Sequence, residues 1–348
     1  IADGKHLPSL KAINRVDLVA FCDLIEEKAI KAAKEYGTPD AKVYTDYQEL
    51  LKDESIDVVH VLTPNRMHAQ ISIDALHAGK HVMCEKPMAK TAEDARRMVA
   101  AAKESGKKLT IGYQHRHKPE TQYLKRVVER GDLGDIYYAK AFAIRRRGTP
   151  NWGVFLNEYE QGGGPLIDIG THALDLTLWC MNNYKPKYCV GSVYKKLGKK
   201  FPTGNAWGDW TEEQFTVEDS AFGFIVMENG ATINLESSWA LNMLDTREAV
   251  TTLCGTDGGL DMNDGIRING IRHGRQYVLK PDLSAGGVAF YEGSNGAKPE
   301  DREAALWIDA VVNDKPPFVL PEQAYAVSQI LEGIYISAKT GEPYYFNK

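Results

Sequence analysis

The chain has 348 residues, of which 43% are hydrophobic and 26% are charged, and its formal net charge at pH 7 is −5. This length suffices for a large core and predicts two domains. A mildly acidic chain gives no electrostatic reason to bind nucleic acid or an anionic membrane surface. The sequence also shows no long apolar run and no recognisable signal peptide, so we expect neither nucleic acid nor a membrane as a partner.

The first 118 residues alternate between apolar runs and amphipathic stretches. Strands are predicted at 16–22, 56–62, 81–84 and 109–113, and helices follow the first three of them. Near-continuous β-branched runs that alternate with helices indicate a parallel sheet covered on both faces. We therefore predict a doubly wound α/β (Rossmann) domain over residues 1–118, an architecture that binds dinucleotides.

Asp23 follows the predicted strand 16–22, where such folds place an acid on the adenosine ribose hydroxyls. Leu24 and Ile25 come next, with no Arg or Ser to receive a 2′-phosphate, so NAD is favoured over NADP. In isolation Asp23 fits a helix N-cap equally well, and both roles can hold at once.

A dinucleotide fold opens with a strand and a G-x-G-x-x-G/A turn roughly 20 residues before that acid. Ile1 and Ala2 already stand where such a turn should end. We expect the first strand and its glycines to precede residue 1, with Ala2 as the third, small position of the turn and 4–12 as the first helix. If no such glycines exist, the pyrophosphate site is incomplete.

The second part, residues 119–348, has a different pattern. Strands are predicted at 136–147, 187–195, 215–227, 231–239 and 249–254, and helices at 302–313 and 321–340. A turn at Glu228-Asn229-Gly230 is typical of a hairpin. We predict an α+β domain with a large, mostly antiparallel sheet, whose C-terminal helices are free to pack back on the first domain. One sheet face would be open to a ligand or a second subunit, so a homodimer or homotetramer is expected.

Cysteine is present five times, and no pair forms a C-x-x-C. An odd number in apolar contexts indicates reduced thiols in a cytoplasmic protein. No metal site is predicted from this spacing.

The predicted strand 81–84 ends in Glu85-Lys86-Pro87. Parallel sheets deliver ligand-binding groups at the carboxyl ends of their strands. A lysine at such a place, before a proline that stiffens the turn, is positioned rather than merely solvated. By itself a Lys-Pro step is usually just a turn.

A second segment, 162–175, begins with three glycines and carries Asp168, His172 and Asp175. Their spacing of i, i+4 and i+7 puts the three side chains on one helix face. The glycines let a substrate or nicotinamide approach the backbone closely, and a histidine flanked by carboxylates can act as a general base. A polar stripe on a surface helix and a mononuclear metal site are the alternatives.

Together, Glu85-Lys86-Pro87 and the segment 162–175 resemble the glucose–fructose oxidoreductase/inositol dehydrogenase family of NAD(P)-dependent sugar oxidoreductases. The similarity runs over nearly the whole chain. It extends to these further segments: Thr63-Pro64-Asn65 with His68, Tyr113-Gln114-His115-Arg116, and 321–325.

The resemblance implies a catalytic set of Lys86, Asp168 and His172. A sugar secondary hydroxyl would give its proton to His172 while its hydride passes to nicotinamide, and Lys86 would stabilise the developing alkoxide. Asp168 would orient the imidazole or bind a neighbouring hydroxyl.

The resemblance also implies which residues contact the ligands. Cofactor contacts are expected from Ala2, Asp23, Thr63, Pro64, Asn65, His68, Glu85, Lys86, Gln114 and Arg116. For Arg116 and Gln114, packing between the domains is the alternative. Tyr113, Trp152 and Phe155 are expected to join the catalytic set around the sugar, because aromatic faces suit the C–H faces of pyranose rings.

The segments 145–152 and 239–242 look like the subset of the family that acts on intact glucosides or anhydrosugars, some members of which oxidise C3 of the glucose unit. Arg145-Arg146-Arg147 is either a solvated or interface strand or a contact to a charged substrate group. Two other functions share the same residues: an NAD-retaining glycosidase that oxidises and eliminates, and a non-catalytic sugar sensor.

Overall fold

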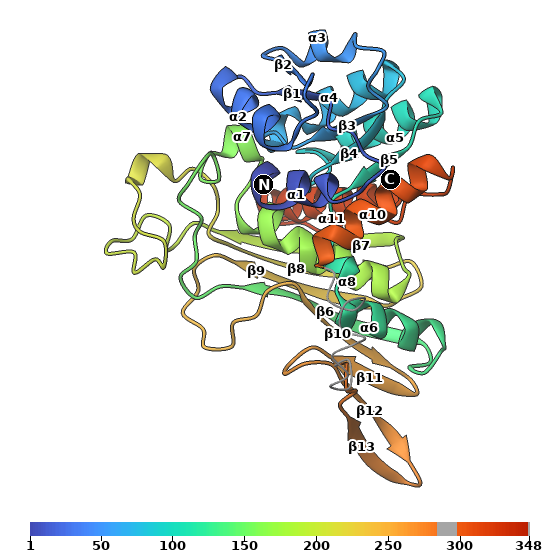
Figure 1. Ribbon diagram of the computed structural model, residues 1–348. Helices are drawn as coiled ribbons and strands as arrows, with labels where there is room; N and C mark the ends of the chain where they lie inside the picture. Colours follow the sequence, from blue (N-terminus) through green and yellow to red (C-terminus); the bar gives the residue numbers. More distant parts are fainter. Residues whose placement is uncertain (284–297, 347–348) are drawn as a thin grey trace.

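The computed structural model describes residues 1–283 and 298–346 (Figure 1). Its first part carries five short parallel strands in two groups. In one, β1 (Ala20–Cys22) pairs with β2 (Lys42–Tyr44). In the other, β3 (Val58–Val61), β4 (His81–Cys84) and β5 (Leu109–Ile111) pair in that order.

Helices precede and connect these strands in the doubly wound manner. They are η1 (Ala2–His6), α1 (Leu7–Lys11), α2 (Glu26–Tyr36), α3 (Tyr47–Leu51), α4 (Asn65–His77) and α5 (Ala92–Ser105). The predicted Rossmann architecture is confirmed. The strand β2 was not predicted, because three residues are too short for an alternating pattern to be recognised.

The two groups of strands are not hydrogen-bonded to each other in the described residues. In a doubly wound sheet of order 3-2-1-4-5-6, the first strand lies between the positions that β1 and β3 occupy here. The strand expected upstream of residue 1 would belong at this place, and it stays a prediction.

The second part is built on a nine-stranded sheet, drawn edge-on below the first part in Figure 1. Its order is β13-β12-β11-β10-β6-β9-β8-β7-β14. The strands are β6 (Ile136–Ile144), β7 (Pro186–Tyr194), β8 (Ser220–Met227), β9 (Thr232–Ser238), β10 (Val250–Gly255), β11 (Gly258–Asp261), β12 (Arg267–Arg272), β13 (Arg275–Leu279) and β14 (Tyr344–Tyr345). The large, mostly antiparallel sheet is confirmed.

Three details of this sheet differ from the prediction. β6 and β9 run parallel, whereas the other neighbouring strands of this sheet, as far as the structure describes them, run antiparallel. β8 begins at Ser220 rather than residue 215, because the chain bends at residues 217 and 219, after the 3₁₀ turn η4 (Glu212–Gln214). The short strands β11 to β13 were not predicted; glycines in β11 and β12 weaken the alternating signal there.

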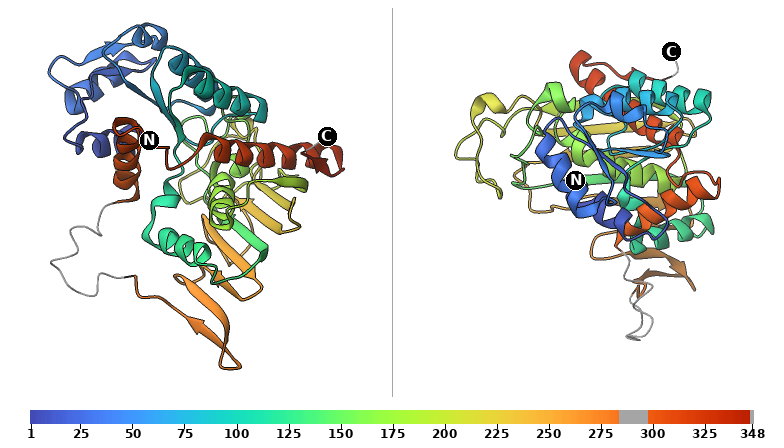
Figure 2. Two further views of the ribbon diagram at one scale, coloured as in Figure 1. Left: turned by 90° about the vertical axis from the view of Figure 1, so that its right-hand side faces the viewer. Right: turned by 45° about the horizontal axis from the view of Figure 1, so that its top comes forward.

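The helices of this part are η2 (Gln114–His117), α6 (Pro119–Glu129), α7 (Glu158–Gln161), η3 (Leu166–Gly170), α8 (Thr171–Met181), α10 (Pro299–Val312) and α11 (Pro321–Thr340). Among them, η3, α8 and α11 pack against the sheet. The helix α8 is almost entirely buried. Figure 2 shows α11 running between the α/β part and the sheet, where it contacts both α5 and β7.

The helix α10 packs against the first part of the chain through Trp307 and Ile308, which share a core cluster with Leu10 and Met83. The change from alternating strands and helices to the nine-stranded sheet falls between β5 and α6. The domain boundary at residue 118 stays a prediction. Within the described ranges, no helix is both long and apolar enough to cross a membrane.

Candidate active site

Lys86 and Asp168 meet where the first part of the chain faces the helices of the second. Lys86 follows the carboxyl end of β4, and Asp168 lies in η3, just before α8. The Lys86 Nζ donates to Oδ1 of Asp168 and to its main-chain oxygen, each at 2.9 Å. Both side chains keep some exposure, 18% and 14%, so a ligand can reach them. The structure therefore brings together two residues that lie 82 positions apart in sequence.

The second carboxylate oxygen of Asp168 is held by residues that directly follow β9 and β6 of the nine-stranded sheet. Trp239 Nε1 donates to Oδ2 at 3.0 Å, and Arg145 Nη1 lies 4.0 Å from the same atom. Lys86 thus has two donors engaged with Asp168, and an ammonium group has three. The third N–H of Lys86 has no hydrogen-bond partner among the described residues. Asp168 orients Lys86, rather than the imidazole that the sequence suggested as one option.

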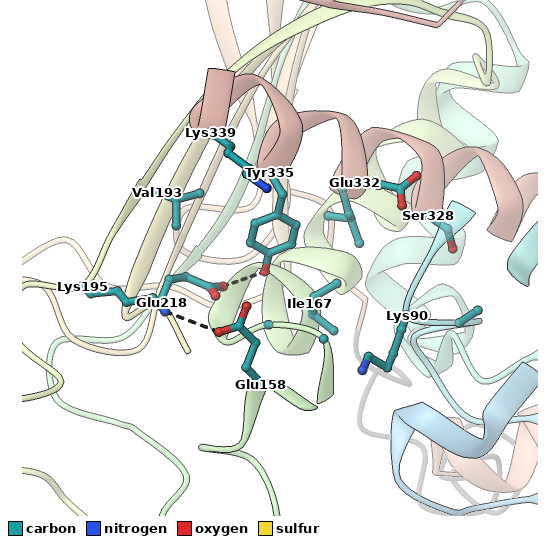
Figure 3. Close-up of a pocket in the computed structure, with 14 residues that line it drawn as sticks. Lys90, Glu158, Ile167, Val193, Lys195, Glu218, Ser328, Glu332, Tyr335 and Lys339 are labelled. Atoms are coloured by element: carbon teal, nitrogen blue, oxygen red, sulfur yellow. Dashed lines mark hydrogen bonds and ion pairs between the residues drawn. The ribbon is translucent and has the colours of Figure 1, made fainter. Parts of the chain in front are cut away.

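The turn that carries Asp168 is a π-helix, a rare form that is frequent at functional sites. Glu218 anchors its beginning: the backbone N–H groups of Gly164 and Leu166 donate to the Glu218 carboxylate at 2.8 and 3.2 Å. The Tyr335 hydroxyl donates to the same carboxylate at 2.8 Å (Figure 3). Burial raises the pKa of Glu218, whereas the backbone and Tyr335 hydrogen bonds lower it. This anchoring residue was not predicted, because nothing in the local sequence marks it.

His172 lies one turn beyond Asp168, buried, with an orphaned Nδ1. Its ring makes edge-to-face contacts with Tyr113 at 6.4 Å and His115 at 4.6 Å between centroids. Burial, followed by the positive charge of Lys86 and by His115, holds the pKa of His172 well below its usual value. His172 is therefore a neutral imidazole, as a proton acceptor must be. His115 was not among the predicted site residues, although it lies in a segment that carried the resemblance.

Asp175 does not flank His172 as the helix spacing suggested. Arg116 Nε and Nη2 donate to its two carboxylate oxygens at 3.0 and 2.6 Å, and both residues are buried. Arg116 Nη1 donates to Gln323 Oε1 of α11 at 2.6 Å. With these donors engaged, Arg116 serves packing between elements, the second of its two expected roles, and we do not propose it as a cofactor ligand.

His68 connects two of the segments that are predicted to bind the cofactor. Its Nδ1 lies 2.8 Å from the Pro87 oxygen and its Nε2 lies 2.8 Å from the Thr63 oxygen. It therefore fixes the Lys86-Pro87 turn against the loop 63–65, and its side chain is buried. We interpret His68 as a positioning residue for both segments.

The loop 63–65 reaches the second part of the chain as well. Asn65 Nδ2 donates to the Gln161 oxygen of α7 at 3.0 Å, while Thr63 and Pro64 are exposed at the end of β3. β5 ends at Ile111 rather than at residue 113 as predicted, and Tyr113 lies two residues beyond it. The Tyr113 hydroxyl donates to or accepts from Thr171 at 3.1 Å, and Gln114 begins η2 beside it. These segments all follow carboxyl ends of parallel strands, where a dinucleotide is held.

Glu85 is buried and satisfied by protein groups. Its Oε1 accepts from Lys5 Nζ at 2.6 Å and lies 2.7 Å from His6 Nε2, and its Oε2 accepts from the Lys86 N–H at 3.1 Å. Lys5 also pairs with Glu303 of α10 at 2.8 Å. Burial alone would raise the pKa of Glu85, but Lys5 and His6 hold it well below its usual value. Glu85 thus fixes the backbone of Lys86, and a direct cofactor contact stays a prediction.

Asp23 and Ala2 are the predicted contacts on the adenosine side. Asp23 Oδ1 accepts from the Ile25 N–H at 2.9 Å in a local turn. The N-cap of α2 is Ile25, so the alternative of a helix N-cap at Asp23 is wrong. Its other oxygen has no partner among the described residues, and Leu24 beside it is 92% exposed. An acid with a free oxygen next to an open apolar surface fits an adenosine ribose. Ala2 begins η1, and its cofactor contact stays a prediction.

Trp152 and Phe155 lie near this centre, with ring centroids 6.0 Å apart. Trp152 is exposed, whereas Phe155 packs partly against the main core. No described contact joins either of them to Lys86 or His172, so their sugar contacts stay predictions.

A pocket of about 330 Å³ lies between α11, the end of β7 and the glycine-rich segment (Figure 3). Its lining includes Gly162, Gly163, Glu218 and Tyr335, but none of the catalytic set. A Cβ at Gly163 would lie 2.1 Å from the Tyr335 hydroxyl. These glycines are therefore needed for packing behind the catalytic turn, in addition to the ligand access that the sequence suggested.

Two family descriptions match this chain. Residues 2–113 match "Oxidoreductase family, NAD-binding Rossmann fold", and residues 121–261 match "GFO/IDH/MocA C-terminal domain". The chain is 36% identical over 345 residues to D-glucoside 3-dehydrogenase of Escherichia coli (strain K12), covering 98% of this chain and 93% of that protein.

Two further comparisons concern levoglucosan dehydrogenase. The enzyme of Pseudarthrobacter phenanthrenivorans is 27% identical over 250 residues, covering 68% of this chain and 62% of that protein. A structure of levoglucosan dehydrogenase in complex with NADH and levoglucosan matches with a TM-score of 0.78 at 21% identity, covering 95% of this chain and 90% of that one. At this identity the structural match supports the fold alone.

Proposed function

Because this chain belongs to the oxidoreductase family with an NAD-binding Rossmann fold and is an NAD-dependent sugar oxidoreductase, we propose that it oxidises the C3 hydroxyl of the glucose unit of a glucoside. One observation carries the assignment of the chemistry to this site. Asp168 accepts a hydrogen bond from Lys86, which keeps one further N–H available, and His172 beside them is buried and neutral. The likeness to D-glucoside 3-dehydrogenase supports the choice of glucoside and carbon.

The cofactor supplies a hydride acceptor when it is bound at the carboxyl ends of the parallel strands. The residues proposed to hold it are Asp23 on the ribose, Thr63, Pro64 and Asn65 beside the nicotinamide half, Gln114 after β5, and Ala2 near the pyrophosphate. His68 and Glu85 keep the backbones of these segments in place.

The residues of the chain account for the movement of the proton. The substrate hydroxyl gives its proton to His172, which is neutral because it is buried next to a cation. Lys86 donates its third N–H to the same oxygen and stabilises the negative charge that develops there. Asp168 holds Lys86 in position, and Trp239 and Arg145 hold Asp168. We propose Tyr113 and Phe155 as walls of the sugar site.

The test is to incubate the full-length protein with NAD and a panel of glucosides, free sugars and inositols, following NADH fluorescence and products together. Accumulation of NADH with a 3-keto-glucoside is the expected result. Release of the aglycone without NADH would instead indicate a redox-neutral glycosidase, and binding without turnover a sensor. Either outcome would overturn the proposal. Lys86→Ala serves as the inactive control.

We further propose that the chain forms homodimers or homotetramers through the free face of the nine-stranded sheet. Val190, Tyr194 and Phe224 are exposed apolar residues on β7 and β8, and Val190 pairs in register with Phe224. Such a patch of apolar side chains on a sheet is typical of a subunit contact. Light scattering of the wild-type protein and of Phe224→Glu tests this: the mass should fall in the variant.

The five free cysteines support the proposal of a cytoplasmic location.

A further inference from the structure

Two large aromatic side chains remain exposed beside the catalytic centre. Trp152 is 51% exposed and Trp207 is 46% exposed, and their rings meet edge to face with centroids 5.1 Å apart. Such an edge-to-face geometry stabilises an aromatic pair beyond its area burial. Leaving this much apolar surface in water is nevertheless unfavourable, and exposed patches of this kind mark binding sites.

Side-chain hydrogen bonds hold the backbone around the two tryptophans in place. Asn205 forms two reciprocal bonds with Thr149: its Oδ1 accepts from the Thr149 N–H at 2.8 Å, and its Nδ2 donates to the Thr149 oxygen at 3.0 Å. Asn151 Nδ2 donates to the Trp207 oxygen at 2.7 Å. The excursion between β7 and β8 is thus bound to the segment that follows β6 (Figure 1), and these bonds place Trp207 over Trp152.

Arg145 connects this aromatic pair to the catalytic carboxylate. Its guanidinium lies 5.4 Å from the centre of the Trp207 ring, and its Nη1 lies 4.0 Å from Asp168 Oδ2. The Arg145 guanidinium therefore lies between the Trp207 ring and the Asp168 carboxylate. Arg145 also forms two bonds with Glu248, at 2.7 and 2.6 Å, so its charge is balanced within the protein.

We propose that Trp152 and Trp207 form an outer subsite that binds the aglycone of the glucoside, and that this subsite takes a planar, apolar group such as an aryl ring. The inference rests on the proposed function, because it assumes that the glucose unit lies at Lys86 and Asp168. A substituent on that unit then extends over Arg145 onto the two indole rings. Since Glu248 and Asp168 balance Arg145, the subsite selects for shape and apolar surface rather than for a negative charge.

The test compares 4-nitrophenyl and methyl glucosides of the same anomeric configuration, with kcat/KM for NAD reduction as the measurement. We expect the wild-type protein to prefer the aryl glucoside, and we expect Trp207→Ala and Trp152→Ala to lower the aryl-to-methyl ratio about tenfold, which corresponds to about 1.4 kcal/mol. Trp207→Phe, which keeps a flat ring, should restore part of the preference.

The matched control is Tyr277→Ala in the β12–β13 hairpin, where Arg272 lies 5.1 Å from the Tyr277 ring in a similar aromatic–arginine contact. This variant should keep the wild-type ratio. The subsite is refuted if the wild-type protein shows no aryl preference, or if Trp207→Ala keeps it. A lower oligomer mass in Trp207→Ala with an unchanged ratio would also refute it and would assign the pair to a subunit contact.

A second readout separates this inference from the proposed function. Quenching of tryptophan fluorescence by 4-nitrophenyl glucoside needs no turnover. If neither glucoside reduces NAD, the proposed function fails. In that case, saturable quenching in the wild-type protein that is lost in Trp207→Ala still supports the subsite, and its absence overturns it.

Discussion

The buried ion pair between Arg116 and Asp175 allows a quantitative test of how the interior is arranged. Its side chains are 0% and 1% exposed and share two hydrogen bonds. Burial raises the pKa of Asp175, and Arg116 opposes this effect. Removing one partner leaves an uncompensated buried charge, which typically costs about 3–5 kcal/mol. We therefore expect Arg116→Met and Asp175→Leu each to lower the free energy of unfolding by about that amount.

The double variant R116M/D175L should recover most of this loss, because replacing both members of a buried pair by apolar residues is often neutral or stabilising. Urea unfolding followed by circular dichroism measures all four proteins. Single losses below about 1 kcal/mol, or a double variant as unstable as the sum of the singles, would refute the reasoning. NAD affinity is measured on the folded double variant. A large loss there would restore the cofactor-binding role for Arg116, whereas we expect little change.

Three predictions concern the catalytic centre. Lys86→Ala should lower kcat about 10²–10³-fold, the effect of losing one donor to a developing oxyanion, with little change in NAD affinity; an equal loss of both in a folded variant would contradict its role. His172 is protonated only below its lowered pKa, so kcat/KM should persist as the pH falls through 6.5 and decline only below it. An acid limb at or above 6.5 would argue against His172 as the base, as would retained activity in His172→Asn. Trp239→Phe removes a hydrogen bond of 3.0 Å to the Asp168 carboxylate, worth about 1.5 kcal/mol, so kcat should fall roughly tenfold, and an unchanged kcat would refute this positioning role.

The sequence by itself determined the architecture of both parts of the chain. Apolar runs alternating with helical periods specify a covered parallel sheet, because these periods depend only on local backbone geometry. The strand-end position of Lys86 followed from the same pattern. Asp168 and His172 were singled out by their helix spacing, and the resemblance added the catalytic roles expected of them.

Only the tertiary structure decided what these residues touch. The helix spacing grouped Asp168, His172 and Asp175 on one face, yet Asp168 lies in a π-helix bound to Lys86, and Asp175 pairs with Arg116. The anchoring by Glu218 and Trp239 also joins segments far apart in the chain. Such contacts depend on which chain segments the packed core brings together, and local periodicity carries no information about them. The parallel pairing of β6 with β9 is of the same kind, since strand direction is set by the path of the connecting chain.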